Sequence, residues 1–215
     1  MYRYLDKLLA GAKKKLRSEF NRLGVMGFDE LNVVNTRKYT EEMFERLLAE
    51  NESVYLKVAK DAYKKGAKAA KEAGFSGEET KIDGSWVATL LAGYNLVTGY
   101  LYNKEAERKR LRLNEQILTA REFDNRPLLN DSIRRTANLW WTQTSQYGIS
   151  AVDKAVITAF KDMGVERVQW VAAEDEKKCE VCGARDGKIY EILKIPEKPH
   201  YRCRCIIVPV VEVEE

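Results

Sequence analysis

The sequence is poor in the residues and patterns that mark most enzymes. It has one histidine among 215 residues, and it shows no glycine-rich phosphate loop and no nucleophile motif. These absences disfavour catalytic chemistry, so we expect a protein that is not an enzyme. No internal repeat and no low-complexity tract is present, so a repeat architecture is not indicated.

Long apolar runs are also missing. The start of the chain lacks the continuous hydrophobic segment and small-residue cleavage site of a secretory signal, so we expect no export by that route. The most apolar stretch, residues 86–102, is interrupted by Gly93, Asn95 and Gly99 and is shorter than the roughly 20 residues of a membrane span. We interpret it as a buried helix, with membrane contact during a later conformational change as the alternative, and we expect no stable membrane span.

Charge of one sign does not dominate. The net charge of +4 is mild for this length, so it permits contact with nucleic acid or an acidic partner without requiring either. Any basic surface must therefore be local.

Apolar residues return every three or four positions through residues 1–120, a spacing that predicts amphipathic helices. We expect a first helix around residues 4–20 and a second from Thr40 to about Gly74, since the Thr40 hydroxyl can cap free backbone amides. A charged, Gly-rich loop should follow at residues 74–84, and a third helix should occupy residues 86–119.

The pattern changes after Pro127, which breaks the third helix. Two shorter helices are expected at residues 131–147 and 150–163, divided at Gly148, with Gly164 closing the second. Residues of high β-propensity then predict three strands, at residues 165–171, 188–192 and 205–213.

The cysteines are concentrated near the C-terminus, and the only histidine lies among them. A Cys-x-x-Cys turn lets two thiolates face one point, and a second pair from a distant strand can complete a tetrahedral zinc site. Because side chains alternate along a strand, the last two cysteines should point the same way, while the histidine on the preceding loop can replace one of them. Cys205 and His200 thus compete for the fourth position. The candidate ligands are Cys179, Cys182, Cys203, Cys205 and His200.

Other interpretations of the cysteines remain open at this point. Reduced thiols can pack as small apolar groups, and two disulfides can form in an oxidising medium. A redox role is disfavoured because the βαβ context of thioredoxin-like motifs is missing, and catalytic zinc is disfavoured because abundant thiolates with a lone histidine favour a closed, structural site. We therefore expect an α+β protein: a helical region at residues 1–124, then a small α/β module at residues 125–215 with a short antiparallel sheet and a Cys-rich, zinc-type clasp.

Three passages in order resemble the Mu protein F-like, or head morphogenesis, family of phage minor head proteins. The first is residues 165–170, which end a helix-glycine-strand passage in tryptophan. The second is residues 175–190, with an acidic residue, the first cysteine pair and a turn into a strand. The third is Pro199 to Cys205, with its proline, histidine and cysteine-arginine-cysteine ending. The resemblance covers residues 133–210.

This resemblance implies a minor head protein of a tailed bacteriophage, located in the virion at the portal vertex and capsid interior, and in the host cytoplasm during assembly. It implies roles in head morphogenesis and DNA delivery, with the portal protein, the major capsid protein or both as partners. Nonspecific contact with phage DNA is a further expectation.

Basic and aromatic residues are candidates for those contacts. The basic run at residues 108–112 can bind the phosphates of DNA nonspecifically. Alternatively, and in our preferred interpretation, it forms the solvent-exposed face of a helix together with its acidic neighbours. Two arginines alternate with the last cysteines and should project away from a metal. Adjacent tryptophans cannot both face one core, so one is a candidate interface anchor. The candidates are Arg108, Lys109, Arg110, Arg112, Arg202, Arg204, Trp140 and Trp141.

Two other functions compete with this one. A zinc-dependent, nucleic-acid-binding regulatory protein would bind DNA with strong salt dependence and would not associate with a portal ring. A zinc nuclease would degrade DNA and would lose that activity in His200→Ala. Asp175 and Asp186 can be interpreted as catalytic carboxylates, but we favour turn residues, because Gly187 supplies a tight turn and no other catalytic motif accompanies them.

Overall fold

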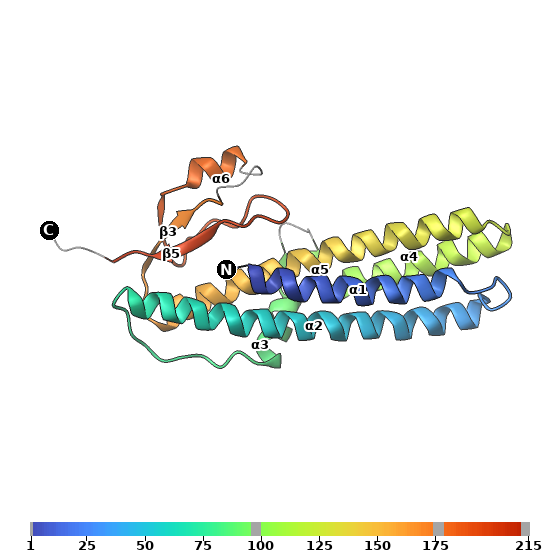
Figure 1. The fold of residues 1–215 in the computed structure, drawn as a ribbon, viewed down its shortest axis with the longest axis horizontal. Coiled ribbons are helices and arrows are strands. Elements are labelled where there is room, and N and C mark those ends of the chain that lie inside the picture. Colours follow the sequence, from blue (N-terminus) through green and yellow to red (C-terminus); the bar gives the residue numbers. More distant parts are fainter. Residues whose placement is uncertain (1, 96–99, 174–178, 212–215) are drawn as a thin grey trace. The chain divides into compact units, whose positions relative to one another are not determined.

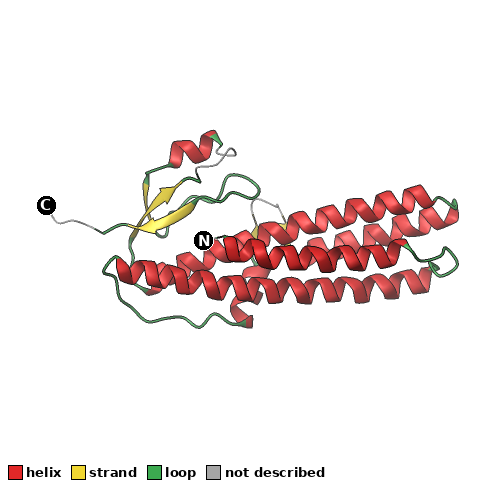
Figure 2. Cartoon of the chain, in the orientation of Figure 1, coloured by secondary structure: helices red, strands yellow, loops and turns green. Residues whose placement is uncertain are grey.

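The computed structural model describes residues 2–95, 100–173 and 179–211. Long helices come first, and a small three-stranded antiparallel sheet with a Cys-rich cluster follows, which confirms the expected fold class (Figures 1 and 2). The helices are α1 (Arg3–Gly24), α2 (Val33–Glu72), α3 (Gly84–Ala92), α4 (Tyr102–Glu122), α5 (Arg126–Asp162) and α6 (Glu180–Arg185). The strands are β1 (Tyr94–Asn95), β2 (Tyr100–Leu101), β3 (Arg167–Val171), β4 (Ile189–Glu191) and β5 (Ile206–Pro209).

The chain divides into two compact units, and α1, α2, α3 and α5 each contribute residues to both. The bundle unit contains Lys7–Val54 and Leu91–Ser145. The cysteine unit contains Met1–Asp6, Tyr55–Leu90 and Gln146–Glu215. The sequence predicted a division into residues 1–124 and 125–215, and that division stays a prediction.

The bundle unit is held by one apolar cluster drawn from α1, α2, α4 and α5. The rings of Phe44 and Trp140 meet edge to face with centroids 5.0 Å apart, and the ring centroids of Phe20 and Phe44 lie 6.5 Å apart in a similar arrangement. Burying a large apolar side chain contributes roughly 1.5–3 kcal/mol. The apolar periodicity of the sequence therefore corresponds to residues that are buried in the core of this unit.

Helix α2 begins earlier than predicted. Asn32 accepts a hydrogen bond from the Asn35 amide through its side-chain oxygen at 2.9 Å, so an asparagine and not Thr40 caps the helix. Thr40 is buried inside α2, where its hydroxyl donates to Asn114 Oδ1 at 2.6 Å. The prediction of a cap at Thr40 was wrong because this polar residue serves packing between helices.

The single helix predicted for residues 86–119 is also wrong. Helix α3 ends at Ala92, and the chain then forms the antiparallel pair of β1 and β2 before α4 begins at Tyr102. Glycine and asparagine lower helix propensity at this place, which accounts for the interruption. Residues 96–99 lie outside the described residues. Across the described ranges, no helix combines the length and apolarity that crossing a bilayer demands.

Helix α5 is continuous through Gly148, where a break was predicted. Its neighbours Tyr147 and Ile149 are buried, and this packing outweighs the roughly 1 kcal/mol that glycine costs inside a helix. Pro127 lies in the first turn, where its missing amide hydrogen is not needed. The predicted helix end is confirmed, because Gly164 takes a positive φ of 75° just after α5.

The three-stranded sheet has the order β4-β3-β5, with both neighbours antiparallel to β3. Val168 and Trp170 of β3 are buried, while the residues between and beside them are not, as one covered face requires. The three predicted strands are confirmed, although β5 ends at Pro209 and residues 212–213 lie outside the described residues.

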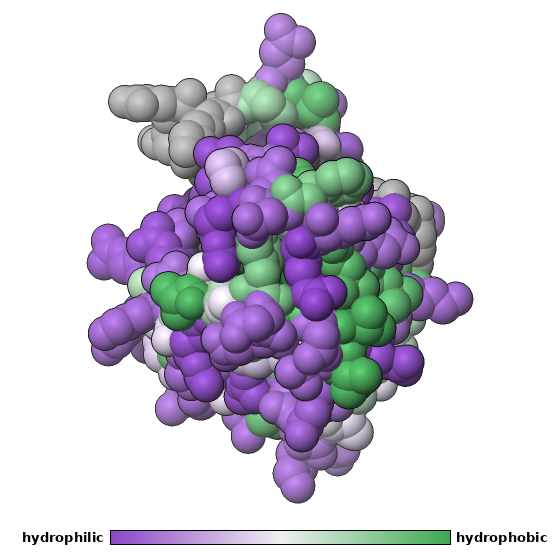
Figure 3. Space-filling model, turned by 90° about the vertical axis from the view of Figure 1, so that its right-hand side faces the viewer, coloured by the Kyte–Doolittle hydropathy of each residue, from purple (hydrophilic) through white to green (hydrophobic). Residues whose placement is uncertain are grey.

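One side of the bundle unit carries the α1–α2 and α4–α5 connections, and Figure 3 views the molecule from that side. Hydrophilic residues cover most of this view, with apolar groups between them. The Arg121 side chain donates to the Phe28 carbonyl at 2.9 Å, which ties the two connections together. Exposed apolar residues in or beside them are Val25, Val33, Val34 and Phe123.

Candidate metal centre

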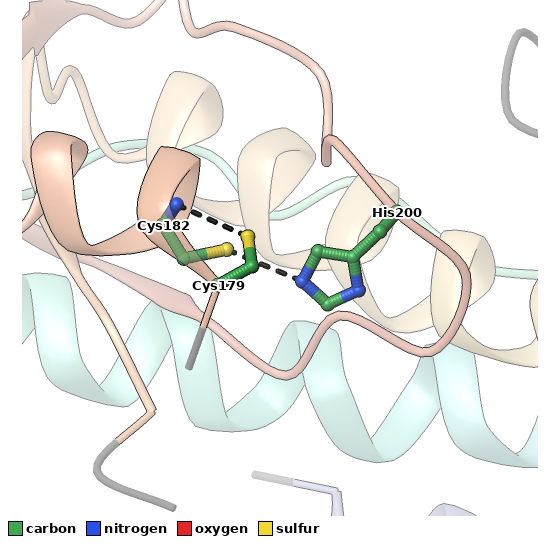
Figure 4. Close-up of side chains that lie close together, drawn as sticks. All are labelled: Cys179, Cys182 and His200. Carbon is green, nitrogen blue, oxygen red and sulfur yellow. Dashed lines mark hydrogen bonds between the residues drawn. The ribbon is translucent and has the colours of Figure 1, made fainter. Parts of the chain in front are cut away.

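The first pair of cysteines lies at the start of α6. Cys179 precedes the helix with extended backbone angles, and its sulfur accepts a hydrogen bond from the Cys182 amide at 3.3 Å. This turn places both sulfurs on one side of the helix end, as Figure 4 shows. The Cys-x-x-Cys spacing therefore folds in the way that its sequence predicted.

The second pair comes from the irregular segment before β5. Cys203 and Cys205 are both buried, and together with Cys182 they pack against Trp170 and Ala172. The sulfurs of Cys182 and Cys203 lie 3.6 Å apart. Neither Cys203 nor Cys205 belongs to a strand, so the strand alternation predicted for them was wrong, but their sulfurs do lie in one cluster with that of Cys182.

His200 approaches the first pair from the loop between β4 and β5. Its Nε2 atom lies 3.3 Å from the Cys182 sulfur, and the imidazole ring faces the two cysteines (Figure 4). The other ring nitrogen, Nδ1, lies 3.0 Å from the Tyr201 carbonyl oxygen. That carbonyl can accept a hydrogen bond from a protonated Nδ1, and in this tautomer the lone pair of Nε2 is available to a metal.

The five candidates form two overlapping groups that share Cys182. Cys179, Cys182 and His200 form one group, and Cys182, Cys203 and Cys205 form the other. Within each group, all ligand atoms lie within 4.8 Å of one another. The structure therefore brings together every residue of the predicted metal set, including both competitors for the fourth position.

The distances match the edges of a small coordination tetrahedron. Zinc–sulfur bonds of about 2.3 Å at tetrahedral angles place two sulfurs roughly 3.7 Å apart. The observed separations of 3.6 Å between Cys182 and Cys203, and of 3.3 Å between Cys182 and His200 Nε2, are of this size. All four cysteines are free thiols. The cluster can therefore hold a metal ion.

The protonation of the thiols follows their surroundings. The Cys182 amide holds the pKa of the Cys179 thiol below its usual value. Burial raises the pKa of the Cys182 thiol, and burial likewise raises the pKa of Cys203. Two of these sulfurs thus favour the protonated form while the cluster lacks a cation, and a bound divalent cation would release those protons.

Three residues that the sequence did not single out surround the second half of the centre. Tyr2 donates to Asp153 Oδ1 at 2.6 Å, and Lys198 forms an ion pair with the same carboxylate at 3.0 Å. Burial raises the pKa of Tyr2 well above its usual value, and burial also raises the pKa of Asp153 against the opposing effect of Lys198. These residues are far apart in sequence and carry no motif, so only the structure reveals them.

The predicted basic run divides between core and surface. Lys109 is buried and donates to Glu105 at 2.6 Å and to Gln143 at 3.0 Å. Arg110 is also buried and pairs with glutamates on α2 and α4, while Arg108 pairs with Glu105. Arg112 is exposed. Contact of these residues with DNA stays a prediction, and Lys109 and Arg110 are the members least accessible to a phosphate.

The predicted tryptophan contacts divide in the same way. Trp140 lies in the core of the bundle unit with 2% of its surface exposed. Trp141 is half-buried, and the Lys13 ammonium lies 5.0 Å from its ring centroid. Trp140 is therefore a packing residue, and Trp141 is the one that can serve as an interface anchor.

The two arginines that flank Cys203 are both exposed, and their projection away from a metal stays a prediction. Arg202 is exposed and has a positive φ of 59°, which is unusual for a residue other than glycine. Arg204 is exposed and donates to Asp6 Oδ1 at 2.8 Å. Arg204 thus has an acidic partner within the chain.

Asp186 serves a turn. Its carboxylate accepts a hydrogen bond from the Ala172 amide at 2.8 Å, and Gly187 follows with a positive φ of 74°. Asp175 lies outside the described residues.

No family model, no curated protein and no solved structure matches the chain.

Proposed function

We propose that the Cys/His cluster binds one zinc ion as a structural clasp. The observation that carries this proposal is the convergence of Cys182 with both Cys203 and His200, at separations that fit the edges of a coordination tetrahedron. Four thiols and one imidazole are the donors that structural zinc prefers, and they suffice to close the coordination shell.

The clasp has a physical task in this part of the cysteine unit. The apolar cluster beside the sheet has only two buried members besides cysteines, Trp170 and Ala172, and its other apolar neighbours, such as Tyr190, Ile195 and Ile207, are only partly buried. Metal binding then contributes folding free energy directly, as it does in small metal-binding domains. The ion joins the start of α6 to the loop before β5.

We further propose that the chain is a minor head protein of a tailed bacteriophage. The resemblance of residues 133–210 to the head morphogenesis family supports this role, as does a cluster suited to structural metal. The protein then resides in the virion at the portal vertex and capsid interior, and it takes part in head morphogenesis and DNA delivery. Its partners are the portal protein, the major capsid protein or both, with nonspecific contact to DNA.

Metal analysis of the purified full-length chain tests the clasp. We expect about one zinc ion per chain, lost in Cys182→Ser. Val181→Ser is the matched control, because Val181 lies between the two cysteines of α6 and is exposed. A chain that carries no stoichiometric metal, or a Cys182→Ser variant that keeps it, would contradict the clasp.

Co-purification with a phage portal protein tests the wider role. We expect association with the portal ring and no turnover of DNA by the zinc-loaded protein. Salt-dependent DNA binding without portal association would favour a regulatory nucleic-acid-binding protein. DNA degradation that His200→Ala abolishes would favour a zinc nuclease.

A further inference from the structure

The loop that carries three of the five ligands has little backbone support of its own. We call residues 192–205, between β4 and β5, the ligand loop. They contain no helix or strand. At the start of the loop, the Ile192 amide donates to the Glu166 carbonyl at 2.8 Å and the Lys194 amide to the Glu191 carbonyl at 2.9 Å. Near its end, the Cys203 amide donates to the His200 carbonyl at 3.3 Å. Side chains must therefore supply much of what fixes the path of this loop.

Lys198 closes the ligand loop from within. Its side chain is mostly buried, and its ammonium donates to the Cys203 carbonyl at 3.1 Å. The same ammonium forms the ion pair with Asp153 of α5 at 3.0 Å and donates to the Tyr2 hydroxyl. One cation thus links the backbone of a ligand residue to a helix and to the N-terminal segment.

Tyr2, in the N-terminal segment, also contacts both helix α5 and the ligand loop. Its hydroxyl donates to Asp153 Oδ1 at 2.6 Å and lies 3.3 Å from the Cys205 carbonyl oxygen. The Lys198 ammonium lies 4.7 Å from the centroid of its ring, within the range of a cation–π contact. Only 7% of the Tyr2 surface is exposed, so these bonds are shielded from water.

Two further bonds attach the ligand loop at Arg202 and Arg204. The Arg202 amide donates to the buried side-chain oxygen of Gln146 at 3.2 Å, which offsets part of the strain of its positive φ. Arg204 pairs with Asp6 of α1. Each bond holds a residue directly beside a cysteine.

From these contacts we infer that Tyr2, Asp153 and Lys198 are positioning residues of the metal centre, so that metal binding and docking of the N-terminal segment are coupled. The inference rests on the proposed metal clasp. A correctly placed ligand loop lowers the entropy lost when the ion binds, because the sulfurs of Cys203 and Cys205 already face it. By linkage, the ion must in turn strengthen the docking of residues 2–6 by the same factor.

Metal affinity and metal release of the full-length chain test this coupling. Tyr2→Phe keeps the ring and removes the hydroxyl, and we expect affinity for zinc to fall about tenfold, or ~1.4 kcal/mol, with faster release to a chelator. Tyr4→Phe is the matched control, since it removes a neighbouring hydroxyl on a half-buried ring, and it should leave both quantities unchanged. Circular dichroism of each variant checks that the fold is retained.

Hydrogen exchange on the wild-type chain tests the reverse direction without any substitution. We expect peptides that contain residues 2–6 to exchange about tenfold faster after the metal is removed. A wild type that binds zinc, with Tyr2→Phe equal to it in affinity and release and with unchanged exchange of residues 2–6, overturns the coupling alone. A wild type that binds no zinc overturns the clasp and the coupling together.

Discussion

The two units of the chain stabilise their structures by different means. The bundle unit spreads its stability over a cluster of more than a dozen buried apolar residues from four helices. The sheet region of the cysteine unit has a small cluster in which three of the five buried members are cysteines. The bundle unit therefore depends on buried area, whereas the sheet region depends on a few specific donor atoms. The helical part of the cysteine unit has buried apolar residues of its own, among them Tyr55, Val156 and Phe160.

Buried polar groups differ between the units in the same sense. In the bundle unit, the Asn51 side chain donates to Tyr102 and to Thr144, each at 2.9 Å. Lys109 and Glu105 neutralise one another beside this group. In the cysteine unit, the buried sulfurs of Cys182, Cys203 and Cys205 lie within 4.8 Å of one another, and burial raises the pKa of the Cys182 and Cys203 thiols. Removal of one polar side chain should therefore disturb only its neighbours in the bundle unit. Removal of one cysteine should disturb the whole cluster.

Removal of the metal is the change with the largest expected effect. Structural zinc contributes on the order of 10 kcal/mol to the folding of small zinc-binding peptides. We expect a strong chelator, or Cys182→Ser, to abolish slow hydrogen exchange in β3, β4 and β5. Peptides from residues 7–54 serve as the internal control and should keep their protection. Unchanged exchange in the sheet after metal removal would break the comparison between the units.

Loss of the central tryptophan should come next in size and should act on the other unit. Trp140→Ala removes a buried ring that packs on Phe44, and we expect the free energy of unfolding to fall by about 3–5 kcal/mol. Trp141→Ala is the control on a half-buried neighbour and should cost about 1 kcal/mol. Denaturant unfolding measures both, and zinc content should be unchanged. Equal losses in the two variants would contradict the assigned roles.

A smaller effect is expected from the buried ion pair of α4. Burial lowers the pKa of Lys109, and Glu105 opposes this by stabilising the ammonium. Lys109→Met leaves Glu105 with Arg108 as its cation, so we expect a loss of about 2 kcal/mol in the free energy of unfolding. Adding Glu105→Gln to this variant should recover part of the loss.

Arg112, an exposed member of the basic run, provides the contrast for this pair. Arg112→Ala should change the free energy of unfolding by less than about 0.5 kcal/mol. If the run contacts phosphates, the same variant should weaken DNA binding and reduce its salt dependence. A large loss of stability in Arg112→Ala would show that the exposed face of α4 contributes to stability as its buried face does.

Local patterns in the sequence predicted the metal set and the sheet. The Cys179-x-x-Cys182 turn depends on a few neighbouring residues, and the strands depend on β-branched residues bounded by turns. Such local signals predict the folded structure correctly because they depend little on residues elsewhere in the chain. The same locality explains why the helix end at Gly164 was predicted correctly.

Tertiary packing decided the features that the sequence did not predict. Gly148 stays helical because its neighbours are buried, and the buried Thr40 is accommodated inside a helix because Asn114 accepts a hydrogen bond from its hydroxyl. The contacts of Tyr2 with Asp153 and with Lys198 join residues 151 and 196 positions apart. No periodicity or motif encodes a contact of that separation, so neither the positioning residues nor these helix boundaries could be predicted from local signals.

The smallest expected effect concerns a part of the cysteine unit that lies outside the metal centre. The Tyr63 hydroxyl donates to Asp162 at 2.6 Å and accepts from the Thr80 amide at 2.7 Å. Burial and then the Asp162 carboxylate raise its pKa from 10 to about 12. Since the unfolded chain loses this proton at lower pH, the stabilisation is complete below pH 10 and is lost as pH rises toward 12.

Tyr63→Phe should therefore cost about 1 kcal/mol near neutral pH, because it removes these hydrogen bonds. The cost should shrink as pH rises from 10 to 12, since only the wild type carries the ionisable hydroxyl. Unfolding of both proteins across this range, with zinc bound throughout, measures the difference. Parallel pH profiles would mean that the Tyr63 phenol ionises equally in the folded and unfolded chains. The helical part of the cysteine unit would then owe nothing to this buried hydroxyl, and its order would depend on apolar packing, as in the bundle unit.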